Sequence, residues 1–207
     1  MKAPATAQIT EKKSRFIGQV FPAATQEEAS DIISDVRKKY WDARHNVSAF
    51  IVGDDMPIER SSDDGEPAGT AGRPVLEVLR GANVRGAVMV VTRYFGGILL
   101  GTGGLVRAYT QSAKAALEAA ELVAVMPSVV LGLTLDYASY GRLKSYLAES
   151  GLEERKADFG QDVRLELVTP EISKDDLIKS VIDMSDGKAS CRELEQGMFE
   201  IDTDLKI

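Results

Sequence analysis

The stretch RSSDDGEPAGTAGRP (residues 60–74) and the stretch TRYFGGILLGTGGLVRAY (residues 92–109) decide how this chain folds. We call them the first and second glycine runs. Both concentrate glycine, arginine and small hydroxyl residues, and ten of the 18 glycines lie between positions 65 and 104. Glycine adopts backbone conformations that other residues avoid and lets other groups approach the backbone closely. We therefore expect the unusual backbone geometry of the molecule in these two runs.

The segments around the two runs predict an N-terminal α+β domain. Residues 87–91 form a continuous apolar run, which is typical of a strand buried on both faces. The second glycine run follows directly and leads into an alanine-rich helix expected at residues 105–121. Further upstream, Thr25 and Glu28 match a capping box at the start of an amphipathic helix. The order strand, glycine loop, helix is one that presents free backbone N–H groups to an anion.

Beyond Pro127 the pattern predicts a second α+β domain. Its expected strands and helices alternate in the order βαββαβ, with strands at 129–135, 152–159, 163–168 and in the segment up to 201, and helices at 140–150 and 173–184. This order is that of the ferredoxin-like fold. We therefore predict two domains, residues 1–125 and residues 126–207.

The composition indicates a globular protein, with 44% hydrophobic and 28% charged residues among 207. Neither a signal sequence nor an apolar stretch long enough to span a membrane is present, so we expect a cytoplasmic protein that does not contact a membrane. The net charge of −7 arises entirely after position 125: 15 basic and 15 acidic residues precede that point, whereas 10 basic and 17 acidic residues follow it. The second half should therefore repel a phosphate backbone, whereas the first half can hold a local anion site.

The first candidate site is an anion site in which backbone N–H groups, the helix dipole and arginine side chains act together. Its residues are Arg73, Arg93, Gly101, Thr102, Gly103, Gly104 and Arg107. The spacing matches neither a Walker A loop nor a Rossmann fingerprint. The alternative is that these glycines only allow the helix to pack tightly on the sheet.

A second group of polar residues is expected to share that site. It consists of Arg44, His45, Asn46, Ser61, Ser62, Asp63, Asp64 and Tyr94. His45, a serine and an aspartate can be combined into a hydrolytic triad, but no nucleophile elbow accompanies them, and a structural role for His45 is the alternative. Asp63, Asp64 and Glu66 offer oxygen ligands to a divalent metal, although adjacent acids in such a loop usually form turns. We predict no catalytic residue, no metal and no cofactor.

Three blocks resemble the signatures of the IMPACT family, in its bacterial YigZ-like branch. They are DARHN (residues 42–46), the first glycine run, and the second glycine run with the preceding valine. The resemblance covers most of residues 10–121, and the C-terminal segment is similar to the small second domain of the bacterial members. The departure from the pattern is Val47, where the family pattern has cysteine.

The resemblance implies an N-terminal domain of the ribosomal-protein-S5-domain-2-like type and a ferredoxin-like C-terminal domain similar to domain V of elongation factor G. In eukaryotes the family is tied to regulation of translation under amino-acid stress. We therefore expect a non-enzymatic regulatory protein that contacts RNA, a ribosome or a phosphate-bearing ligand through its N-terminal loops.

Several parts of this interpretation stay open. Tyr94 and Phe95 are candidates for stacking on a base, with core packing as the alternative for Phe95. The acidic second domain is expected to dock on a protein. An enzyme that acts on a small phosphorylated or nucleotide substrate, by phosphoryl transfer or hydrolysis, and a protein-interaction module are the alternative functions. The sequence leaves the oligomeric state undetermined.

Overall fold

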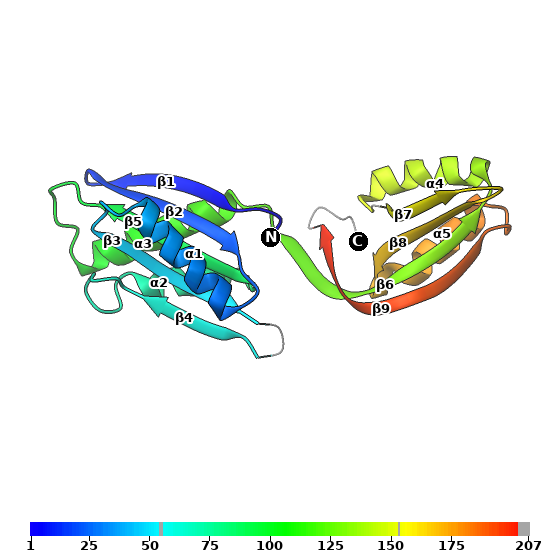
Figure 1. Ribbon diagram of the computed structural model, residues 1–207. Helices are drawn as coiled ribbons and strands as arrows, with labels where there is room; N and C mark the ends of the chain where they lie inside the picture. Colours follow the sequence, from blue (N-terminus) through cyan, green and yellow to red (C-terminus); the bar gives the residue numbers. More distant parts are fainter. Residues whose placement is uncertain (54–55, 153, 203–207) are drawn as a thin grey trace. The chain divides into compact units, whose positions relative to one another are not determined.

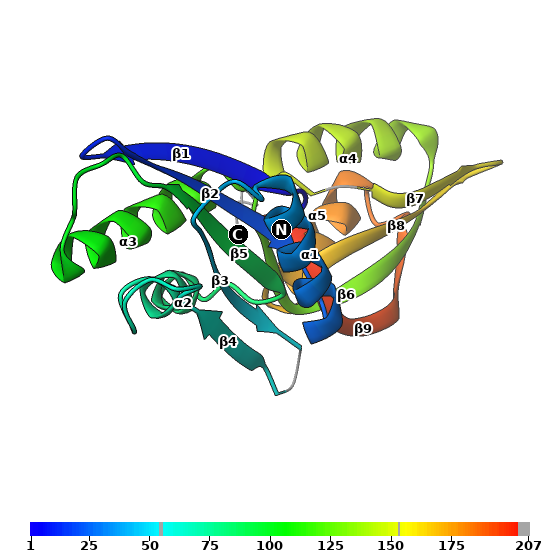
Figure 2. The ribbon, with the colours of Figure 1, turned by 60° about the vertical axis from the view of Figure 1, so that its left-hand side comes forward.

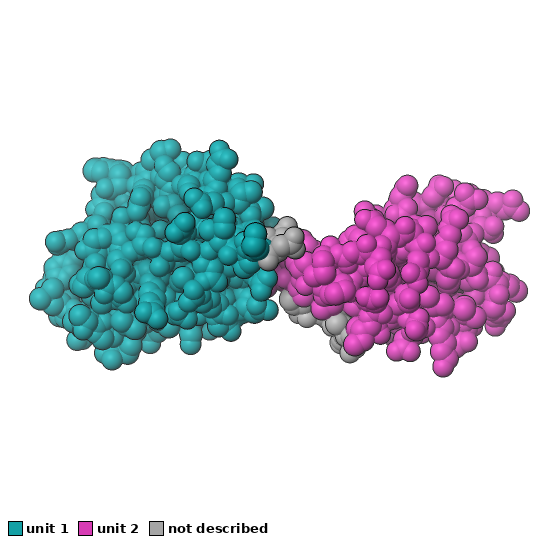
Figure 3. All heavy atoms as spheres, turned by 90° about the horizontal axis from the view of Figure 1, so that it is seen from below, with its two compact units in different colours: residues 1–121 teal, residues 122–207 magenta. Residues whose placement is uncertain are grey.

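The computed structural model describes residues 1–53, 56–152 and 154–202. The chain divides into two compact units, residues 1–121 and residues 122–207, which are drawn in different colours in Figure 3. We call them unit 1 and unit 2.

Unit 1 is built on one five-stranded sheet. Its elements are, in chain order, β1 (Ala5–Glu11), β2 (Ser14–Pro22), α1 (Gln26–Lys39), β3 (His45–Val52), β4 (Ile58–Ser62), α2 (Gly72–Gly81), β5 (Ala87–Tyr94) and α3 (Thr102–Glu118). The strands lie in the order β1-β2-β5-β3-β4, and neighbouring strands are antiparallel. Helix α1 packs on one face of the sheet, and α2 and α3 pack on the other (Figures 1 and 2).

The core of unit 1 is organised around β5, the central strand. Residues 87–93 are all buried, so the predicted buried strand is present and extends to Tyr94. The capping box of α1 is also present. The Glu28 backbone N–H donates to Thr25 Oγ1 at 3.2 Å, and the Glu28 carboxylate accepts from the Ala24 N–H at 2.7 Å.

The hairpin turn between β1 and β2 has an unusual backbone. Glu11 pairs with Ser14, so the turn consists of Lys12 and Lys13, whose φ angles are 44° and 65°. Two consecutive left-handed residues are normally glycine or asparagine, and each lysine here costs about 1 kcal/mol of backbone strain. Gly96 lies directly against the turn, where its N–H donates to Ser14 Oγ at 3.2 Å. The segment between β5 and α3 is therefore fixed against this turn.

Unit 2 contains a four-stranded antiparallel sheet with two helices on one face (Figure 1). Its elements are β6 (Val123–Leu135), α4 (Tyr137–Ser150), β7 (Glu154–Phe159), β8 (Val163–Pro170), the short 3₁₀ helix η1 (Glu171–Ser173), α5 (Lys174–Met184) and β9 (Ser190–Asp202). The strands lie in the order β7-β8-β6-β9, and the predicted βαββαβ sequence of elements is present. Gly151 ends α4 in the left-handed conformation, as expected of a C-terminal glycine.

The join between the units differs in detail from the expected one, because β6 begins at Val123 and runs through Pro127. Up to Pro127 the described residues of β6 pair with β9 alone, and from Ser128 they pair with β8 as well. Proline lacks an N–H donor and is tolerated where one edge of a strand is unpaired. Pro127 therefore lies within a strand and does not end one. The compact units divide after Glu121, close to the predicted boundary at residue 125.

Replacing Gly96 with alanine should destabilise unit 1 by at least about 2 kcal/mol, because overpacking forces the backbone to move. A Cβ at this position would lie 2.0 Å from the carbonyl carbon of Lys13. Gly81→Ala is the matched control, since a Cβ there has no neighbour within 4 Å, and its effect should stay within about 1 kcal/mol. Urea denaturation of both variants measures the difference, and equal stabilities would contradict the packing described.

Candidate functional site

The buried carboxylate of Glu66 joins the segments that carry the predicted site residues. Glu66 Oε1 accepts hydrogen bonds from Arg93 Nη1 at 2.5 Å and from the Tyr109 hydroxyl at 2.8 Å, and it lies 3.8 Å from His45 Nε2. Only 4% of the Glu66 side chain is exposed. Arg93 is positioned by strand pairing, opposite Phe16 of β2 and His45 of β3. We call Glu66, Arg93, Tyr109 and His45 the Glu66 cluster.

The Glu66 cluster holds a charge pair in the protein interior. Burial and the nearby charge of Glu66 raise the pKa of Tyr109 far above its usual range, so the phenol keeps its proton and donates it to the carboxylate. The Arg93 guanidinium lies 5.4 Å from the centroid of the Phe16 ring, and its buried Nε has no hydrogen-bond partner among the described residues. Arg93, expected to face an external phosphate, thus has an internal anionic partner.

His45 is held by groups of the first glycine run. Its Nδ1 lies 2.8 Å from the carbonyl oxygen of Asp64, and because a carbonyl only accepts, Nδ1 carries the hydrogen. The other ring nitrogen, Nε2, points toward the Glu66 carboxylate. Ser61 and Ser62 lie on β4, where Ser62 Oγ accepts from the Asp64 N–H at 3.3 Å. Within the described contacts His45 hydrogen-bonds to no serine, and its partners are the Asp64 carbonyl and Glu66.

Asp64 connects the first glycine run to the 42–46 block. Its carboxylate accepts from the backbone N–H of Asn46 at 2.7 Å and from Arg37 of α1 at 2.7 Å. The turn that follows is closed by the Glu66 N–H, which donates to the carbonyl of Asp63 at 3.0 Å. These bonds fix the loop that carries Glu66 against the start of β3.

The carboxylate of Asp63 occupies the N-terminus of α2. It accepts from the backbone N–H groups of Gly69, Ala71 and Gly72 at 2.8, 3.0 and 2.8 Å. Partial burial acts to raise the pKa of Asp63, but the three N–H donors outweigh it, and the net pKa is below the usual value. The first glycine run thus supplies its own anion.

The second glycine run, in contrast, leaves the start of α3 open. Its N-cap is Gly101 with φ 72°, no side chain in the described part of the chain caps the helix, and its first turn contains no acidic residue. Residues 101–103 and Arg107 are exposed. Helices α1 and α4, by comparison, are capped by Thr25 and Asp136. The first N–H groups of α3 are therefore presented to solvent.

The predicted blocks meet through the Glu66 cluster, and residues 101–104 lie about two helical turns before Tyr109. Gly104 packs against the side chain of Leu100. Arg44 is exposed immediately before β3. Arg73 is exposed on α2, where its Nε lies 4.0 Å from Glu77.

Some exposed residues near these blocks were missed by the sequence analysis. Trp41 is 81% exposed and directly precedes Asp42, whose carboxylate accepts from the Tyr94 hydroxyl at 2.8 Å. The guanidinium of Arg15 lies over the Tyr94 ring, 4.3 Å from its centroid. The available signal was a lone tryptophan at the edge of the 42–46 block.

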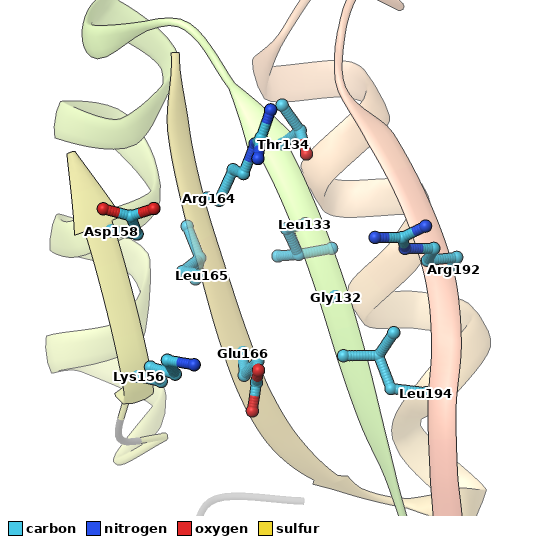
Figure 4. A pocket seen from close by; sticks show the side chains of 10 residues that line it. All are labelled: Gly132, Leu133, Thr134, Lys156, Asp158, Arg164, Leu165, Glu166, Arg192 and Leu194. Carbon is cyan, nitrogen blue, oxygen red and sulfur yellow. The ribbon is translucent and has the colours of Figure 1, made fainter. Parts of the chain in front are cut away.

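Unit 2 contains a hollow of about 220 Å³ on the sheet face that the helices leave open (Figure 4). Strand register places Asp158 beside Arg164, and Lys156 beside Glu166 in the next row. Opposite charges on neighbouring strands stabilise a sheet. Arg192 adds a further cation to the lining. The residues predicted for the site all lie in unit 1, so we place the candidate site there.

Within the described ranges, no three His, Cys, Asp or Glu side chains gather in a way that would hold a metal ion. No helix of the described part is long and apolar enough to cross a membrane.

Glu66→Gln should destabilise the protein by about 3 kcal/mol, because the neutral amide leaves the Arg93 charge buried without a counter-charge. Glu77→Gln is the control, since Glu77 pairs with Arg80 at the surface and its loss should change stability by less than about 1 kcal/mol. Chemical denaturation measures the free energy of unfolding of both variants. Equal losses would show that the buried pair contributes no more to stability than the surface pair.

Asp63→Asn should destabilise the protein by about 1 kcal/mol at neutral pH, because the N–H groups at the start of α2 bind a charged carboxylate more strongly than a neutral amide. The folded-state pKa of Asp63 is lowered, so its contribution is full above the unfolded pKa of about 3.9 and disappears as the pH falls through the lower folded value. The stability difference between wild type and variant should therefore vanish in acid. Urea denaturation across a pH series tests this, with Asp31→Asn on the exposed face of α1 as control. A difference that stays constant with pH would contradict it.

Comparisons with known proteins place the chain in a family. The Impact N-terminal domain family matches residues 12–117, and a domain of unknown function (DUF1949) matches residues 133–188. IMPACT family member YvyE of Bacillus subtilis (strain 168) is 35% identical over 193 residues, which cover 93% of this chain and 89% of the relative. IMPACT family member YigZ of Escherichia coli (strain K12) is 35% identical over 94% of this chain and 96% of the relative. A crystal structure of a hypothetical protein, 34% identical, covers 94% of this chain and 95% of its own with a TM-score of 0.56. The chain therefore belongs to the IMPACT family, which confirms the resemblance seen in its sequence.

Proposed function

We propose that this IMPACT family member is a non-enzymatic regulatory protein that binds RNA through one end of unit 1. We call this surface the loop end; it consists of the β1–β2 turn (residues 12 and 13) with Arg15, residues 40–46, and residues 94–107. Strand pairing and the contact between Gly96 and the turn bring these segments together at one end of the sheet (Figure 1).

The observation that carries the proposal is an imbalance between acidic and basic side chains at the loop end. Four neighbouring carboxylates already have internal partners, namely Asp42, Asp63, Asp64 and Glu66. Five exposed cations have no carboxylate within ion-pair distance among the described residues, namely Lys12, Lys13, Arg15, Arg44 and Arg107. One carboxylate beside the turn differs from these four. Glu11 has no side-chain hydrogen bond or ion pair in the described part of the chain. The surface is therefore locally basic in an acidic protein, which favours a polyanion.

The backbone of the turn supports the same interpretation. Lys12 and Lys13 occupy left-handed positions that glycine or asparagine would occupy at lower cost. Strain of this kind is frequent at functional sites. Two lysines at such positions are best explained by a use for their charge.

The open N-terminus of α3 supplies a matching place for a phosphate. Its first backbone N–H groups face solvent, and Arg107 lies in the second turn of the same helix. Helix N-termini bind phosphate through these N–H groups and the helix dipole. In this proposal residues 101–104 and Arg107 hold one phosphate, and Lys12, Lys13 and Arg44 contact others. Arg93 acts indirectly in this proposal, because its ion pair with Glu66 fixes the first glycine run against β5.

RNA is favoured over a small phosphorylated substrate because the free cations come from three separate segments. A small substrate needs convergent groups and a catalytic residue, and the contacts of His45 among the described residues are structural. We therefore propose a binding protein in place of an enzyme.

The finer fold assignments and the biological setting belong to the same proposal. The strand order of unit 2 supports a ferredoxin-like domain similar to domain V of elongation factor G. We assign unit 1 to the ribosomal-protein-S5-domain-2-like type. The link to the ribosome, to translation and to the cytoplasm rests on family membership, and docking of unit 2 on a protein rests on its acidic composition.

Arg107→Ala and Lys13→Ala should each weaken RNA binding severalfold and reduce the slope of log affinity against log salt by about 1, because each removes one phosphate contact. Lys114→Ala is the matched control, an exposed cation about two turns further along α3. Fluorescence anisotropy of a labelled RNA across a salt series gives both quantities.

Two results would contradict the proposal. The first is an absence of RNA binding by the wild-type protein at low salt. The second is an equal loss of affinity in Lys114→Ala, which would show that general charge and not the loop end determines binding.

A further inference from the structure

The loop end exposes an unusually large aromatic surface. Trp41 is 81% exposed and Phe95 is 44% exposed, whereas aromatic residues of this size are mostly buried in globular proteins. Tyr94 adjoins Trp41, since its hydroxyl donates to Asp42, the residue after Trp41. The Phe95 ring lies near Arg93 instead, 5.7 Å from its guanidinium. Trp41 and Tyr94 therefore belong to one region of the surface, whereas Phe95 lies on the side of Arg93.

The turn that carries Trp41 is held in place. The Ala43 N–H donates to the carbonyl of Tyr40 at 3.0 Å, and Asp42 accepts from Tyr94 at 2.8 Å. Tyr40 itself packs against the core under α1. Trp41 thus projects from an ordered turn, and its indole is presented to solvent with little conformational freedom in the backbone beneath it.

Cations stand next to the rings. The guanidinium of Arg15 lies 4.3 Å from the centroid of Tyr94, and Arg44 is exposed three residues after Trp41. Alternation of exposed aromatic rings with basic groups is the arrangement that binds single-stranded nucleic acid, in which bases stack on the rings while the cations contact the backbone. Inside a duplex the bases are stacked on one another, so only the terminal pairs offer a ring face to an indole.

We propose that Trp41 is a base-stacking residue and that the ligand of the loop end is single-stranded RNA. This inference rests on the proposed function and narrows it, because phosphate contacts alone do not distinguish one strand from two. One unpaired base stacks on the indole, and Arg44 and the lysines of the β1–β2 turn contact the phosphates on either side.

Trp41 is the single tryptophan of the chain, so its fluorescence reports on this position alone. The probes are an oligouridylate and an oligoadenylate of about ten nucleotides and a duplex RNA of equal length, titrated at low salt. Excitation at the red edge of tryptophan absorption avoids the tyrosines, and anisotropy of a labelled RNA measures affinity independently. Stacking should quench Trp41 emission on binding of the single strands and leave it nearly unchanged with the duplex.

Trp41→Ala should weaken single-strand binding about tenfold, and Trp41→Phe should restore most of the loss, because phenylalanine still offers a ring. The matched control is Ile172→Ala, which removes an apolar side chain that is 83% exposed in unit 2 and should leave binding unchanged. Circular dichroism of the Trp41 variants confirms that they fold.

The outcomes separate the inference from the proposed function. RNA binding that depends on salt and on Arg107, but without quenching and with full affinity in Trp41→Ala, overturns the stacking role and leaves the proposed function standing. Equal affinity and equal quenching for duplex and single strand also overturn it. If the protein binds no RNA at all, both the stacking role and the proposed function are wrong. The exposed rings would then be assigned to a surface that docks on a protein.

Discussion

A single buried carboxylate sets the architecture of unit 1. Glu66 is withdrawn from water and is stabilised there by a guanidinium from the central strand and a phenol from α3. Such a group is costly to bury unless it is fully partnered, so all three segments must reach their places together. The loop that carries Glu66 has few apolar residues of its own. The Glu66–Arg93 ion pair and the Asp64 bonds to β3 and α1 hold this loop in place where apolar packing otherwise would.

The two glycine runs solve the same local problem in opposite ways. Each leads into a helix N-terminus whose N–H groups lack partners within the helix. In the first run Asp63 fills that position from inside the chain, and the loop closes on itself. In the second run the position stays open, and one of the glycines, Gly96, makes a close contact with the β1–β2 turn. The two runs are therefore similar in composition but differ in structure: the first forms a closed loop and the second an open one.

Local patterns in the sequence were sufficient for most elements and for the family. The apolar run at residues 87–91, the capping box at Thr25 and the glycine after α4 each depend on neighbours within a few positions, and the structure has all three. The internal role of Arg93 depends on contacts with residues far away in the chain. Strand alternation places Arg93 on the same face as Val91, the face that α3 covers, but only the position of Glu66 shows that the guanidinium is neutralised there. Trp41 was missed because exposure of an aromatic residue after a helix cannot be read from periodicity.

The hairpin turn of Lys12 and Lys13 has a consequence for how this protein responds to selection. Its backbone would be relaxed by Asn-Gly, a change that removes both positive charges. Thermal stability and the proposed affinity for RNA therefore favour different residues at these two positions. A library selected for heat resistance alone should accumulate relaxed, uncharged turns, and it should lose the proposed RNA binding without any loss of fold.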